Sequence, residues 1–208
     1  MEGLMKGLYT VSLWVTRLAY VNILWVSFTI LGIVIVGFYP ATTAMFAVIR
    51  KWVLGDHDIP IFKTFWSNYK KEFVKSNILG LFISIIAFIM YSSLNIISSL
   101  TIPTLKILYI PNGLVTLLFL LTILYIFPVF VHYDVKLTKV AKNAFIIMTI
   151  NPIATFCMVV LSGFLVYMIH TFPGLIPFFS GSVIAFLLMF LSNYAFNRAS
   201  KKVEMTWS

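Results

Sequence analysis

The chain has 208 residues, of which 61% are hydrophobic, 17% aromatic and only 10% charged. Soluble globular domains carry about 25% charged residues, so this composition excludes a soluble globule and indicates a protein embedded in a lipid bilayer. A net charge of +9 would suit nucleic acid, but the basic residues lie beside the apolar runs and form no separate basic domain, which favours anionic lipid as their counterpart.

We expect residues 1–208 to form a single domain. The first quarter of this sequence predicts a surface helix, a membrane span and a short helix. Residues 4–17 are mildly amphipathic, and residues 18–36 form a charge-free run long enough to cross a bilayer. We expect Gly37 and Pro40 to interrupt the helix as a hinge, because glycine loosens the backbone and proline lacks an amide donor. Residues 40–53 reach only roughly 21 Å at about 1.5 Å per residue, so they either re-enter or cross a locally thinned bilayer; the charge distribution favours crossing.

Small and then basic residues follow this expected hinge. Thr42 and Thr43, flanked by alanines, offer a surface on which another helix can approach closely inside a bilayer. Basic and aromatic side chains are typical of anchors at the headgroup level of a membrane. The expected anchors are Arg50, Lys51, Trp52 and Trp66.

Residues 62–75 predict an amphipathic helix lying in the headgroups, because aromatic residues recur there at helical spacing and lysines occupy the other positions. Apolar runs then predict spans at residues 76–97 and 112–131, joined by an outside loop whose only charged residue is Lys106. The sequence His132-Tyr133-Asp134 comes next. A proton-transfer pair is conceivable there, but adjacent side chains point apart on a helix, which favours simple boundary residues.

Residues 135–150 predict a basic amphipathic helix on the cytoplasmic side. Its expected apolar stripe comprises Leu137, Ala141, Ala144, Phe145 and Met148. Such a helix can pack on the membrane surface or dock on a partner, including the nucleotide-binding subunit of a transporter. The residues expected to make a partner contact are Lys136, Lys139, Lys142 and Phe145.

The last quarter predicts spans at residues 153–171 and 178–194, joined by a tight outside turn. Arg198, Lys201 and Lys202 place the C-terminus in the cytoplasm by the positive-inside rule, with the N-terminus on the same side. The expected fold class is therefore all-α: a polytopic transmembrane helical bundle with five spans, one short or re-entrant helix and cytoplasmic amphipathic helices.

Motifs for catalysis and cofactor binding are missing from the sequence. It contains no Walker A sequence and no GxGxxG, and its neighbouring motifs supply neither a nucleophile-base-orienter trio nor a Cys/His cluster. The lone Cys157 lies in an apolar run and suits a core position. We therefore expect no enzymatic activity, no cofactor and no metal site, and no nucleic-acid partner.

Five stretches carry a resemblance to a known family. They are residues 37–52, Ile59-Pro60-Ile61-Phe62-Lys63-Thr64-Phe65-Trp66, Tyr125-Ile126-Phe127-Pro128, Lys142-Asn143-Ala144-Phe145 and Pro173-Gly174-Leu175. Through them the chain resembles the YesL-type bacterial integral membrane proteins, a family without an established activity. The resemblance implies a multi-pass protein of the bacterial cytoplasmic membrane that assists a carbohydrate ABC importer, with its permease subunits as partners.

A second function stays open on the residues alone. Polar and aromatic groups suit carbohydrate, so Asn22, Thr43, Tyr91 and Asn95 could line the path of a small stand-alone permease or facilitator for sugars or other small solutes. The same side chains are equally explained as polar groups that pack helices together.

Overall fold

The computed structural model describes residues 2–99, 103–133 and 135–207, with side chains described at residues 5–99, 106–133 and 135–199. Every regular element in these ranges is a helix, which confirms the all-α class. The elements are α1 (Glu2–Leu31), α2 (Ile35–Val53), α3 (Ile61–Lys71), α4 (Phe73–Ser99), η1 (Pro103–Leu108), α5 (Tyr109–His132), α6 (Leu137–Ile150), α7 (Pro152–Thr171), η2 (Pro173–Leu175), α8 (Ile176–Phe179) and α9 (Ser182–Trp207).

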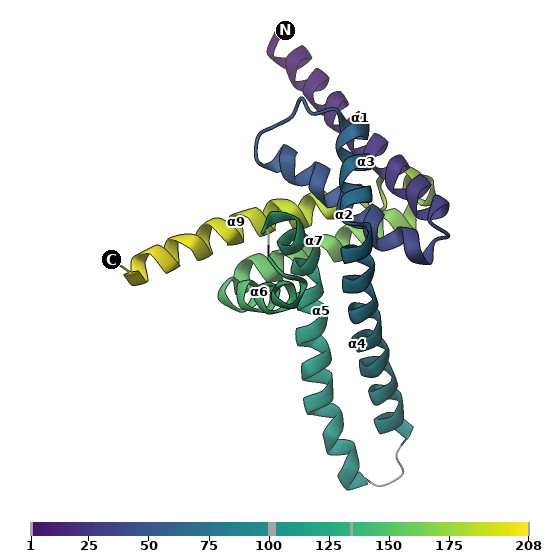
Figure 1. Ribbon diagram of the computed structural model, residues 1–208, viewed down its shortest axis with the longest axis vertical. Coiled ribbons are helices and arrows are strands. Elements are labelled where there is room, and N and C mark those ends of the chain that lie inside the picture. Colours follow the sequence, from purple (N-terminus) through teal and green to yellow (C-terminus); the bar gives the residue numbers. More distant parts are fainter. Residues whose placement is uncertain (1, 100–102, 134, 208) are drawn as a thin grey trace.

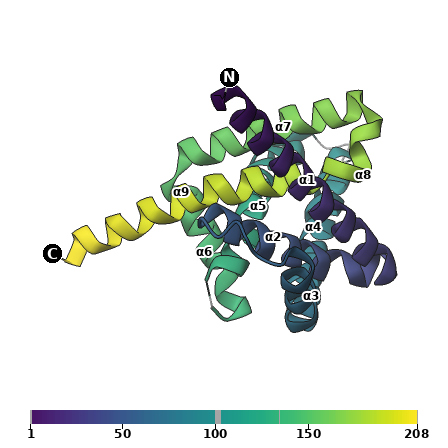
Figure 2. The ribbon, with the colours of Figure 1, turned by 90° about the horizontal axis from the view of Figure 1, so that it is seen from above.

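Helices α4 and α5 form a hairpin that projects from a body built by the other helices (Figure 1). Helices α7 and α9 run across the axis of this hairpin in Figure 1, and Figure 2 shows both lengthwise when the molecule is seen from above. The long helices therefore do not all run parallel to one another.

Four helical segments in the described ranges have the length and apolar composition to cross a membrane. They are Met5–Leu31, Phe73–Ser99, Lys106–His132 and Pro152–Thr171. A fifth crossing requires two helices together, because Pro173–Phe179 and Ser182–Ala199 meet at a bend of 58°. These segments overlap the five spans expected from the sequence, as is typical of a multi-pass membrane protein.

Helix α2 lies at the centre of the body and is not one of these candidate spans. It packs against α1, α3, α4, α5 and α9. Ala41, Ala44 and Val48 are completely buried along it, and small side chains of this kind let neighbouring helices approach closely. The crossing favoured for residues 40–53 therefore gains no support from the length and apolar composition of this helix.

The break between α1 and α2 lies at residues 32–34, so the hinge expected at Gly37 and Pro40 is misplaced. Ile33 and Val34 adopt φ values of 57° and 56°, which β-branched residues rarely do. Nothing in two apolar β-branched residues signals a turn. Gly37 and Pro40 are both buried inside α2, and a side chain added at Gly32 would collide with the Gly37 backbone. Gly37 thus permits close approach of the chain to itself and does not end a helix.

Two further expectations are corrected by the helices themselves. Residues 4–17 do not form a separate surface helix, because α1 runs without interruption from Glu2 to Leu31. On α6 the buried residues are Val140, Ala144, Ile147 and Met148, whereas Ala141 and Phe145 are exposed. The face that α6 buries is therefore rotated around the helix axis relative to the expected apolar stripe. Asp134 and the side chains of Lys201 and Lys202 lie outside the described residues.

Candidate functional site

A polar cleft lies where the end of α2, the junction of α3 with α4, and the end of α5 meet. It consists of two adjoining hollows of about 320 and 330 Å³ that share Glu72, Phe130 and Tyr133. Three segments distant in the sequence supply its walls: residues 43–51, 68–75 and 130–137. Because only the tertiary fold brings them together, no local motif could have marked the cleft.

Helical spacing explains which side chains of α2 and α3 line the cleft. Thr43, Ala47 and Arg50 follow one another at intervals of four and three residues, so they share one face of α2. Asn68 and Lys71 share a face of α3 in the same way, and Glu72 follows at its end. Lys75 continues this face on the first turn of α4.

The cleft is strongly basic in charge. Its described lining contains five cationic side chains and one carboxylate, that of Glu72. The cations are Arg50, Lys51, Lys71, Lys75 and Lys136. A concave surface lined by one sign of charge concentrates the electric field and attracts ions of the opposite sign.

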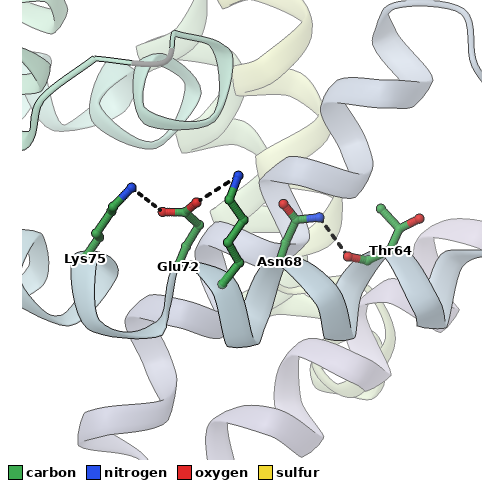
Figure 3. A network of polar contacts seen from close by, with 5 residues as sticks. Thr64, Asn68, Glu72 and Lys75 are labelled. Carbon is green, nitrogen blue, oxygen red and sulfur yellow. Dashed lines mark hydrogen bonds and ion pairs between the residues drawn. The ribbon is translucent and has the colours of Figure 1, made fainter.

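Glu72 is held between two lysines at the junction of α3 and α4. Its carboxylate lies 3.6 Å from the ammonium group of Lys71 and 3.7 Å from that of Lys75, and Figure 3 shows the contact with Lys75. The Glu72 side chain is only 16% exposed, whereas both lysines are mostly exposed. Each pair contributes about 0.5 kcal/mol or less, as is usual for ion pairs near a surface. Their main effect is to orient the two ammonium groups beside the cleft.

Arg50 lies half-buried in the wall of the cleft. Its Nε donates to Nδ1 of His132 at 3.5 Å, the long end of the range for such a bond. The His132 ring packs on Phe196, with ring centroids 4.5 Å apart. Of the carboxylates that the structure describes, none lies within ion-pair distance of Arg50. Its guanidinium group therefore keeps donors that no acid in these ranges occupies.

Tyr133 adds a neutral hydroxyl group to the cleft, just beyond the end of α5. Burial raises the pKa of this phenol above its usual value near 10. At neutral pH the hydroxyl group is therefore protonated and able to donate a hydrogen bond. Thr43 is less available, because its oxygen accepts a hydrogen bond from the Ser76 hydroxyl at 2.9 Å.

The residues expected to contact a partner fall on one exposed edge of α6. Lys136, Lys139 and Lys142 are exposed, and the Phe145 side chain is 45% exposed. Of these four, Lys136 also lines the cleft. The other three lie outside it.

The residues expected at the hinge and on its packing surface are buried in α2. Thr42 accepts a hydrogen bond from Nε1 of Trp25 at 3.0 Å, which joins α2 to α1. Thr43 joins α2 to α4 through Ser76. Both hydroxyl groups therefore lie at helix contacts.

The expected anchors divide into three environments. Arg50 and Lys51 line the cleft. Trp66 is 39% exposed, with the Lys70 ammonium group 4.8 Å from its ring centroid. Trp52 is only 1% exposed and packs edge-on against Trp14, so it cannot serve as a surface anchor.

The polar residues considered for a sugar path do not share one lining. Asn22 is completely buried and bonds to the backbone around α8 and α9. Thr43 serves the contact with Ser76. Tyr91 and Asn95 are exposed on α4, and the Asn95 amide bonds to the Tyr91 carbonyl of the same helix. Each group is thus engaged in a different contact.

The sequence pattern did not mark Asn68, Glu72, Lys75 and Tyr133 as residues of a common site. The alternating lysines and aromatics of residues 62–75 were visible in the sequence, but their partners on α2 and α5 were not. In the part of the chain that the structure describes, no three His, Cys, Asp or Glu side chains cluster as a metal site would require.

Comparisons with known proteins agree on one family. The family model described as "Protein of unknown function, DUF624" matches residues 18–94. The uncharacterized protein YesV of Bacillus subtilis (strain 168) is 38% identical over 184 residues, which cover 88% of each chain. No solved structure matches the chain.

Two further relatives come from the same organism. The uncharacterized protein YesL is 35% identical over 199 residues, which cover 96% of this chain and 94% of YesL. The uncharacterized protein YteU is 37% identical over 179 residues, which cover 85% of this chain and 79% of YteU. With such identity over most of its length, the chain belongs to the YesL-type family of bacterial integral membrane proteins.

Proposed function

We propose that this protein is a non-enzymatic accessory protein of a carbohydrate ABC importer in the bacterial cytoplasmic membrane, with both termini in the cytoplasm. It assists transport or assembly by binding the permease subunits, and its basic edge reaches the nucleotide-binding subunit. The family resemblance suggests the transporter.

The exposed edge of α6 is the observation that supports a docking role. One face of this helix is buried through Val140, Ala144 and Ile147 and packs against α5, α7 and α9. The opposite side presents Lys139, Lys142 and the half-exposed Phe145. A helix that holds cations beside an aromatic side chain suits an acidic surface with an apolar pocket, because opposite charges attract across an interface and aromatic side chains serve as its anchors.

Charge reversal on α6 tests this contact. In a bacterium that encodes a carbohydrate ABC importer, the tagged full-length chain should copurify with permease subunits in a mild detergent. We expect Lys136→Glu/Lys139→Glu/Lys142→Glu to reduce their recovery about tenfold, since three exposed ion pairs at ~0.5 kcal/mol each are lost and repulsion is added. Mass spectrometry of the purified complex measures the recovery.

A matched control reverses three lysines elsewhere. Lys6, Lys63 and Lys70 are exposed on α1 and α3, so Lys6→Glu/Lys63→Glu/Lys70→Glu changes the net charge equally and leaves α6 intact. Equal losses in both triple variants would show a general charge effect and refute docking through α6. Migration of the wild-type chain alone in every mild detergent would refute the accessory function itself.

A further inference from the structure

We infer that the basic cleft between α2, α3 and α5 binds a phosphate group, with Arg50 as its central ligand and Lys51, Lys71 and Lys75 around it. The inference concerns the cleft alone and does not depend on association with a transporter.

The state of Arg50 is the first argument. A half-buried guanidinium group has lost part of its hydration, and loss of hydration is unfavourable for a charge unless another group compensates. Its Nε reaches only a neutral ring nitrogen of His132, at 3.5 Å. The remaining N–H groups form a planar fork that matches the oxygens of a phosphate. An anion in the cleft would therefore satisfy the groups that the described chain leaves open.

The surrounding charges are the second argument. Among the described residues, five cations from α2, α3, α4 and the N-cap of α6 line the two hollows together with one carboxylate. That carboxylate, Glu72, is already paired with Lys71 and Lys75 and so repels an incoming anion little. Five cations and one carboxylate leave a net charge of about +4 in the described lining, and a bound dianion or diester would relieve the remaining repulsion.

Size and position complete the argument. Hollows of about 320 and 330 Å³ fall within the lower range of small-ligand sites and exceed the volume of one phosphate group. The cleft also lies at the base of the α4–α5 hairpin, where two candidate spans leave the apolar region. Phosphates of lipid headgroups occur at this level, and basic pockets between spans commonly bind them. The phosphate of a soluble ester presents the same chemistry.

The experiment measures binding by the purified full-length protein in detergent micelles. Thermal unfolding is followed with added phosphatidylglycerol, with phosphatidylcholine as the zwitterionic reference, and with inorganic phosphate against chloride of equal ionic strength. We expect phosphatidylglycerol or inorganic phosphate to stabilise the wild-type chain, and Arg50→Gln to weaken that binding at least about tenfold, since charge-assisted bonds to phosphate are lost.

Further variants separate a specific site from general attraction. Arg50→Lys keeps the charge but loses the fork, so its affinity should fall between those of the wild type and Arg50→Gln. Lys71→Gln/Lys75→Gln tests the cleft through two mostly exposed side chains if Arg50→Gln does not fold. Lys63→Gln/Lys106→Gln removes two charges outside the cleft and should bind like the wild type.

Comparing phosphatidylglycerol with inorganic phosphate identifies which kind of molecule bears the bound phosphate group. Stabilisation by phosphatidylglycerol alone identifies a lipid headgroup, and stabilisation by inorganic phosphate as well identifies a site that takes the phosphate of either source. Equal binding by the wild type, Arg50→Gln and Lys71→Gln/Lys75→Gln would overturn the inference. So would the absence of stabilisation by both additions.

Discussion

Asn22 connects α1 to the break between α8 and α9 through one fully buried side chain. Its amide nitrogen donates to the carbonyl oxygens of Ile176 at 3.4 Å and Pro177 at 2.8 Å. Its oxygen accepts from the backbone amides of Gly181 at 2.9 Å and Ser182 at 3.0 Å. These backbone groups lie where one helix ends and the next begins, and such ends lack partners within their own helix. Asn22 therefore stabilises the bend between α8 and α9.

Replacement of this side chain should be destabilising. Asn22→Ala removes the partner of the Pro177 carbonyl and of the Gly181 and Ser182 amides, and each backbone group left unsatisfied away from water costs roughly 1–3 kcal/mol. We expect a loss of about 2 kcal/mol or more, seen as a lower unfolding temperature of the purified protein in detergent. Asn95→Ala is the control, because the Asn95 amide is exposed and bonds only within α4. Equal unfolding temperatures for the two variants would contradict the role assigned to Asn22.

The connection between α1 and α2 is a close contact of backbone with backbone. Gly32 faces Gly37 across the turn, and a side chain added at either glycine would overlap backbone atoms. Backbone cannot move aside as the end of a long side chain can, so the two helices would have to separate. The positive φ values at Ile33 and Val34 are maintained by this packing, since the two residues alone would not favour them.

A pair of glycine substitutions tests this turn and should give opposite results. Gly32→Ala should destabilise the protein by about 1–3 kcal/mol through overpacking. Gly113 lies in α5 with open space where its Cβ would be, so Gly113→Ala should leave stability unchanged or raise it by up to ~1 kcal/mol. Unfolding temperatures in one detergent provide the comparison. A neutral Gly32→Ala would show that the two helices are not in close contact.

At the scale of the whole molecule, the α4–α5 hairpin separates two polar levels. The 27 residues of α4 extend about 40 Å at roughly 1.5 Å per residue, more than the ~30 Å hydrocarbon core of a bilayer. Lys75 and the basic cleft lie at one end of this helix, and Lys106 lies in η1 near the other end. The buried residues of α4 and α5 lie near the cleft, so the far part of the hairpin requires lipid around it.

Cysteine labelling tests whether this hairpin crosses the membrane. In a Cys157→Ser background, a membrane-impermeant maleimide should modify Lys106→Cys in intact cells and Lys75→Cys only after permeabilisation. The expected sides follow from the positive-inside rule, because Lys106 is isolated from the other basic residues. Labelling of both positions in intact cells would contradict a crossing by α4. Labelling of Lys75→Cys alone would invert the orientation.

The spans at residues 76–97, 112–131 and 153–171 were predictable because an apolar run of about 20 residues has few alternatives to a membrane helix. The amphipathic helix at residues 135–150 was predictable from its lysines, yet the face it buries was not. Val140 and Ile147 are apolar, and so are Leu137 and Phe145, so only the neighbouring helices decide which of them is covered. Trp52 shows the same limit: its sequence neighbours suggest a surface, while the packing of α1 buries it.

Composition and hydropathy by themselves determined the helical class and the membrane as solvent, because both are properties of runs of residues along the chain. The tertiary structure alone decided that α2 lies at the centre, that the chain turns at Ile33 and Val34, and that Arg50 meets His132 across 82 positions of sequence. The physical reason is that packing and charge clustering depend on distances between segments, and these distances exist only once the helices have assembled.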